Sequence, residues 1–237
     1  MVKRAGPAGL RPLRYFFVIG LHPPYALVIL VVIVATGIVT LTLDASELDA
    51  GLGMVLFAQM FLASTGFVVR ARRGHFDPLL THSSDRARIA AAHWFASTFP
   101  GVSAWVMLVI IAAIAGAPDA ASPIAGGRAA ALLIVSAVSW AAGFWLPRGA
   151  AGMLWMALLM GLVVQRAELL AVPAGGSGAV SFAAHTATLL VCPFLLLGKH
   201  PPLAPGALPA ATALPLVLLF VVWRRARGLD VYLVDRS

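Results

Sequence analysis

The residues best suited to hold a metal ion or a haem iron in this sequence are its histidines. There are six of them, at His22, His75, His82, His93, His185 and His200. A bis-histidine haem requires two ligands facing each other at one depth between packed helices. His75 and His82 are close enough to share a helix face, but they lack supporting carboxylates. We therefore expect solvated histidines near the ends of apolar segments, with no metal and no cofactor in this chain.

The sequence also lacks the motifs of nucleotide binding and of nucleophilic catalysis. No G-x-x-x-x-G-K-[ST] phosphate loop occurs, and Ser177 lacks the glycine spacing of a nucleophile elbow. The single Cys192 lies in an apolar stretch, which excludes an internal disulfide and a cysteine-built zinc site. Glu168 is the one carboxylate near the end of a long apolar run, whereas proton-coupled carriers usually need one inside the bilayer. We expect a non-catalytic chain.

The composition indicates a membrane protein. Of the 237 residues, 61% are hydrophobic and only 11% are charged, against about 25% charged in an average soluble domain. Several charge-free runs approach or exceed the roughly 20 residues that cross a bilayer as a helix. They do not alternate as the strands of a membrane barrel do. The sequence predicts an all-α, polytopic membrane protein.

The runs predict one transmembrane domain over 1–237 with six spans. The spans are expected at about 25–43, 51–69, 93–115, 128–146, 150–168 and 207–223. An amphipathic inner-surface helix is expected over 10–22, in preference to a simple basic flank before the first span. Segment 179–198 is either a re-entrant outer hairpin or a seventh span. Six spans leave fourteen of the seventeen Lys and Arg residues on one side, so the positive-inside rule favours the hairpin.

The charge distribution sets the orientation. The formal net charge is +8, but the basic residues form short clusters between apolar runs rather than one face. Such clusters are typical of cytoplasmic loops, whereas a nucleic-acid binder gathers them with aromatic or polar readers. We expect a multi-pass protein of a bacterial cytoplasmic membrane with both termini in the cytoplasm and no nucleic-acid partner.

The longest predicted cytoplasmic loop, 70–92, carries helix signals. Asp77 precedes Pro78, which is a typical helix start. A second helix is expected to start at a capping Ser83 or Ser84, with Asp85 favourable in its first turn. This second helix should continue into the third span, with a kink at Pro100-Gly101.

This loop resembles the type-2 ABC exporter permeases. The resemblance rests on Gly74, the pair Leu79-Leu80 and Arg86 between two spans, and on the hairpin with Cys192-Pro193-Phe194. In that family the loop contacts a separate ATPase subunit. The residues that the resemblance assigns to this contact are Gly74, Asp77, Leu79, Leu80, Ser84 and Arg86. The chain departs from the family pattern with Arg70–Arg73 in place of an acidic residue before the glycine.

The resemblance implies the function and the partners. Two permease chains, identical or related, would sit on two ATPase subunits that bind ATP and Mg, and would export a lipid-like or hydrophobic molecule. Polar residues at membrane depth are candidates for the pathway or for helix–helix contacts: Gln59, Ser64, Thr65 and Gln165. The alternatives are a haem-handling permease of cytochrome c maturation, suggested by Ala92-His93-Trp94, a membrane-embedded enzyme or cytochrome subunit, and a scaffold subunit.

Overall fold

The computed structural model describes residues 48–63, 67–68, 85–114, 127–146, 178–197 and 203–227, with isolated positions at 15–16, 31, 150, 153–154 and 157. Every regular element in this part of the chain is helical, which confirms the predicted all-α class. The elements are α3 (Leu48–Ala63), α6 (Arg86–Ile114), α7 (Gly127–Gly143), α10 (Gly178–Val191), the 3-10 turn η4 (Pro193–Leu196) and α11 (Ala207–Ala226).

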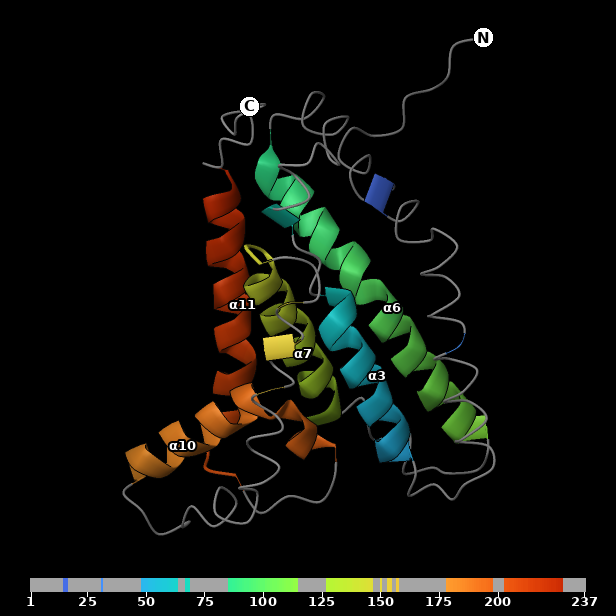
Figure 1. Cartoon of the computed structure of the whole chain (residues 1–237). Coiled ribbons are helices and arrows are strands. Elements are labelled where there is room, and N and C mark those ends of the chain that lie inside the picture. Colours follow the sequence, from blue (N-terminus) through green and yellow to red (C-terminus); the bar gives the residue numbers. More distant parts are fainter. Residues whose placement is uncertain are drawn as a thin grey trace.

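Four of these helices form a bundle. Helices α3, α6, α7 and α11 lie alongside one another, and α6 runs opposite to α7 (Figure 1). Helix α10 lies across the end of the bundle where α11 begins, and η4 packs against the start of α7 (Figure 1). The chain enters α11 through Gly206, whose φ of 82° is left-handed and suits a residue without a Cβ.

The helix bounds test the predicted spans only in part. Within the described residues, α11 is the one helix that is both long and apolar enough to cross a bilayer, and only 28% of its most apolar window is buried. Three other apolar helices are shorter, at Gly51–Ala63, Gly127–Gly143 and Gly178–Val191. The predicted spans at 25–43 and 150–168 and the inner-surface helix at 10–22 lie outside the described residues, isolated positions aside.

Two apolar clusters hold the bundle together. The aliphatic cluster includes Leu56, Leu132, Leu189 and Leu196, and it joins α3, α7, α10 and η4. The aromatic cluster lies nearer the end where α6 begins and α11 ends; its large members are Phe16, Phe67, Trp94, Trp140 and Phe144. Buried alanines from α3, α6, α7 and α11 occur in one cluster or the other. Small side chains let helix backbones approach closely, which is the common packing mode of helices in lipid.

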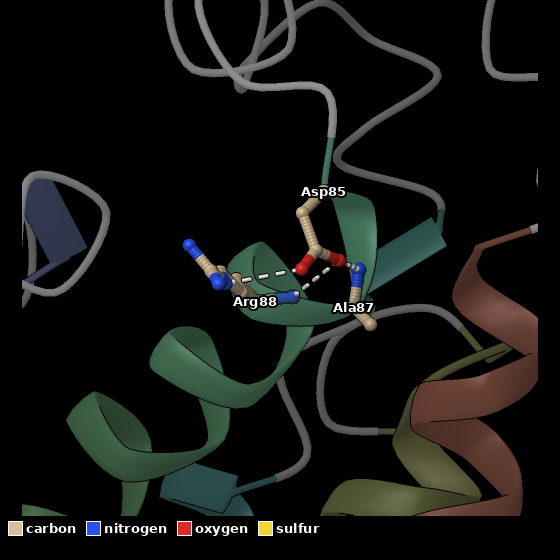
Figure 2. Close-up of polar contacts among 3 residues, drawn as sticks. All are labelled: Asp85, Ala87 and Arg88. Carbon is tan, nitrogen blue, oxygen red and sulfur yellow. Dashed lines mark hydrogen bonds and ion pairs between the residues drawn. The ribbon is translucent and has the colours of Figure 1, made fainter. Parts of the chain in front are cut away.

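Helix α6 begins one residue later than a serine cap would place it. The N-cap is Asp85, whose Oδ1 accepts from the backbone N–H of Ala87 at 3.2 Å and of Arg88 at 3.4 Å (Figure 2). Asp85 Oδ2 also forms an ion pair with Arg88 Nε at 3.1 Å. An Asp at this position satisfies otherwise unpaired N–H groups and complements the helix dipole. The expectation that Ser83 or Ser84 caps this helix is therefore wrong.

Candidate functional site

Most of the predicted functional residues fall outside the described part of the chain. These are Gly74, Asp77, Leu79, Leu80 and Ser84 of the loop, and Ser64, Thr65 and Gln165 of the pathway set. Two predicted residues, Arg86 and Gln59, are described. They lie on different helices, Arg86 at the first position of α6 and Gln59 within α3.

Both flanks of the loop are fixed to the aromatic cluster. Before the loop, the backbone N–H of Val68 donates to the carbonyl of Phe144 at 2.9 Å. Phe67 stacks on Phe144 with ring centroids 5.0 Å apart and an interplanar angle of 11°. After the loop, Ile89 and Ala90 in the first turns of α6 are fully buried in the same cluster. Residues 67–68 and 89–90, on either side of the predicted 74–88 contact segment, therefore belong to one packed unit.

Gln59 makes a contact between α3 and α6. Its side chain is fully buried, and its Nε2 donates to the carbonyl of Ser97 at 3.1 Å. Gly101 leaves the space for it, because a Cβ at that position would lie 2.8 Å from Gln59 Cδ. Gln59 Oε1 is buried with no hydrogen-bond partner among the described residues.

This contact lies beside the proline of α6. Helix α6 continues through Pro100, which has no N–H to give to the carbonyl of Ala96 one turn earlier. Gln59 donates to the next carbonyl, that of Ser97, and the Ser97 hydroxyl donates back to the carbonyl of Trp94 at 2.9 Å. Side chains thus donate hydrogen bonds to backbone carbonyls where the proline interrupts the regular helical hydrogen bonding, as occurs in membrane helices.

His93 is buried, so the expectation that it is a solvated histidine is wrong. Its exposed fraction is 4%, and its Nδ1 accepts a 3.0 Å hydrogen bond from the indole N–H of Trp140. Phe16 and Phe67 meet its ring edge-on, with centroids 4.8 and 5.1 Å away. The partner, Trp140, lies 47 residues away on α7. Local sequence gave no signal of this pairing.

The His93–Trp140 hydrogen bond aligns α6 with α7, so residues at equal distances from His93 and from Trp140 lie at the same height in the bundle. Because α6 and α7 are antiparallel, Ser97 and Ser136 each lie one helical turn further in the same direction. Gln59 reaches this level through Ser97. We call Gln59, Ser97 and Ser136 the polar layer. The hydroxyl of Ser136 is buried without a partner in the described structure, unlike that of Thr188, which bonds the carbonyl one turn before it at 2.8 Å.

His185 is half-buried and makes a structural contact that the sequence did not predict. Its Nδ1 accepts from the backbone N–H of Ala204 at 2.9 Å, and this bond ties α10 to the segment that leads into α11. Among the described residues, no three His, Cys, Asp or Glu side chains are grouped to hold a metal ion. The arrangement offers hydrogen-bonding groups inside an apolar bundle and basic groups at one end.

The basic groups at that end belong to two helices. The arginine end, as we name it, consists of Arg86, Arg88, Arg224, Arg225 and Arg227. The first turns of α6 and the last turns of α11 meet there in the aromatic cluster, where the rings of Trp94 and Trp223 are 5.6 Å apart (Figure 1).

Comparison with known proteins gives no match: no family model, no curated protein and no solved structure is significantly similar to this chain.

Proposed function

We propose that this chain is the membrane subunit of an ATP-driven exporter, coupled through its 74–88 loop to a separate ATPase subunit. The observation that carries the proposal is the continuity of α6. One helix of 29 residues joins the end of the loop to the interior of the bundle. Its start is capped by Asp85 and anchored by Ile89 in the aromatic cluster. A force on the loop would therefore move α6 as a unit.

In this proposal the chain has six spans, with α3, α6, α7 and α11 belonging to the second, third, fourth and sixth. The segment α10–η4 is the re-entrant outer hairpin. Two observations support the hairpin over a seventh span. Helix α10 has 14 residues, or about 21 Å at 1.5 Å per residue, against a hydrocarbon core of about 30 Å. It also ends before Pro193, where the chain turns onto the start of α7.

The membrane is proposed to be the bacterial cytoplasmic membrane, with both termini inside. The arginine end is then cytoplasmic, in agreement with the positive-inside rule. A second permease chain and two ATPase subunits that bind ATP and Mg complete the transporter. The transported molecule is proposed to be lipid-like or hydrophobic, because the described interior holds no charged side chain among its buried residues.

The haem-handling alternative depended on Ala92-His93-Trp94. The Nδ1 of His93 accepts a hydrogen bond from Trp140, and aromatic rings surround the imidazole. These contacts are those of a side chain packed between helices. Absorbance of the purified chain in the Soret region would favour this alternative over an exporter of other molecules.

Two experiments test the exporter. The first is purification of the chain from its native membrane in mild detergent, with a stoichiometric ATPase subunit as the expected companion. The second replaces Leu79 and Leu80 by Asp, which should abolish coupling of ATP hydrolysis to the permease because two charges enter an apolar contact. Leu233→Asp in the C-terminal tail is the matched control. Unchanged coupling in the loop variant would count against the proposal.

A further inference from the structure

We propose that the outer face of α11 binds one acidic phospholipid, with its phosphate at Arg224 and Arg225 and its acyl chains along the helix below them. This goes beyond the exporter function and depends only on the membrane location proposed above. The occupant is an anionic lipid of the cytoplasmic leaflet.

The first support is the pattern of the exposed face of α11. Six large apolar side chains of α11 are 43–59% exposed, and four of them follow one line along the helix: Leu214, Val217, Leu218 and Val221. Their spacing of three, four and seven residues places them on one side of the helix. The buried residues of α11 lie on the other side, at Ala211, Pro215, Leu219, Val222 and Ala226. We call the four aligned residues the α11 stripe.

The second support is the charge at the end of the stripe. Arg224 and Arg225 follow Val221 by three and four residues, so they continue the same side of the helix. Both guanidinium groups are exposed, and no carboxylate pairs with them in the part of the chain that the structure describes. The only acidic residue described near this end, Asp85, is already engaged with the α6 backbone and Arg88.

The dimensions fit one lipid leaflet. Leu214 and Arg225 are eleven residues apart on one helix, which is about 16 Å along the axis. Half of a 30 Å hydrocarbon core is about 15 Å. An apolar stripe of this length that ends in two positive charges matches an amphiphile with an anionic head and apolar tails.

The third support is a pair of indole rings beside the charged end of the stripe. Trp223 directly precedes Arg224, and its ring packs edge-on against that of Trp94. The indole N–H groups of both residues are buried with no hydrogen-bond partner in the described structure, and Trp94 is 7% exposed. These N–H groups lie beneath the surface that a lipid would cover, so the support from the two residues is the position of their rings. Indoles are also typical of the level at which headgroups lie.

The test measures lipid retained by the purified full chain. The chain is reconstituted in vesicles of phosphatidylcholine and phosphatidylglycerol, extracted in mild detergent, and its bound lipids are counted by native mass spectrometry. We expect about one phosphatidylglycerol retained in preference to phosphatidylcholine. The double variant Arg224→Gln/Arg225→Gln should lower the preference about fivefold per arginine, since each basic residue near an anionic surface contributes about 1 kcal/mol. Rising salt should lower it in the wild type as well.

The matched control is Arg128→Gln/Arg166→Gln, which removes the same charge from the opposite side in the proposed topology and should leave the preference unchanged. Equal retention of the two lipids, or an equal loss in the control, would overturn the proposal. So would loss of ATPase co-purification in the α11 variant with lipid retention intact, because the arginines would then serve a protein. Failure of the chain to enter vesicles at all would instead refute its membrane location.

Discussion

The indole of Trp140 and the imidazole of His93 are joined by a 3.0 Å hydrogen bond inside the aromatic cluster. Because Nδ1 of His93 accepts, its ring proton is on Nε2, so the residue is a neutral partner in a buried contact between α6 and α7. This bond sets the relative height of the two helices and with it the polar layer one turn away.

Trp140→Phe should therefore destabilise the bundle. It leaves a buried nitrogen without a donor and removes apolar surface, at a cost of about 1–3 kcal/mol for the unpaired acceptor. Thermal unfolding in detergent measures the loss. In the double variant His93→Phe/Trp140→Phe both polar groups are gone, and part of the stability should return. Trp145→Phe, at an exposed ring, is the control; an equal loss there would contradict a specific role for the hydrogen bond.

Gly101→Ala should displace Gln59. The new Cβ would lie 2.8 Å from Gln59 Cδ and closer still to Oε1, so the amide must leave the Ser97 carbonyl. Overpacking of this kind costs about 1–3 kcal/mol. Adding Gln59→Ala removes the clash and should recover part of that loss, again read by thermal unfolding. Gly53→Ala is the control, because its nearest neighbour, Leu197 Cδ1, is at an ordinary 3.7 Å. Additive effects of the two changes would show that these residues do not interact.

Asp85→Ala should fray the start of α6. The Ala87 and Arg88 amides lose their acceptor, and cap removal costs about 1 kcal/mol. Hydrogen exchange of these amides should accelerate about fivefold if they exchange through local opening, whereas amides near Ala104 should not change. Asp85→Asn retains a capping oxygen and loses the exposed ion pair, which contributes little. If Asn behaves like Ala, the ion pair and not the cap holds this turn.

His185→Ala should loosen the link between α10 and α11. The backbone N–H of Ala204 loses its acceptor, at a net cost of about 0.5–1.5 kcal/mol. Exchange of that single amide is the measurement. Thr188→Val is the matched change, because its hydroxyl bonds only within α10. Exchange at Ala204 that is unaffected by His185→Ala but raised by Thr188→Val would refute the link.

The positions of the helices could be predicted from the sequence, because they depend on composition. The side-chain partners could not, because they depend on how the helices pack. Charge-free apolar runs indicated helices where α3, α7 and α11 are found, and the predicted start at residue 207 coincides with that of α11. Helix α6 starts seven residues before the predicted span at 93–115, which confirms the prediction that a helix beginning near Asp85 continues into this span.

Side-chain environments were less predictable. His93 lies near the basic loop in sequence, which suggested an exposed position, but its burial depends on Trp140 from a distant helix. Gln59 was predicted to serve either a pathway or a helix–helix contact, and the structure shows it in the contact with Ser97. Neither partner is encoded in a local pattern, since each depends on how α6 rotates about its axis against its neighbours.

The length of α6 has a consequence for its place in a bilayer. Its 29 residues extend about 43 Å, which exceeds a hydrocarbon core of about 30 Å by about 13 Å, or roughly two and a half turns. If α6 spans the membrane as proposed above, an upright α6 must protrude from it, and the arginine-bearing start of the helix is the part suited to do so. Ser97 is eleven residues from Arg86, or about 16 Å. In the topology proposed above, the first turns of α6 would form a stalk on the cytoplasmic side, and the Pro100 segment would lie in the inner half of the membrane.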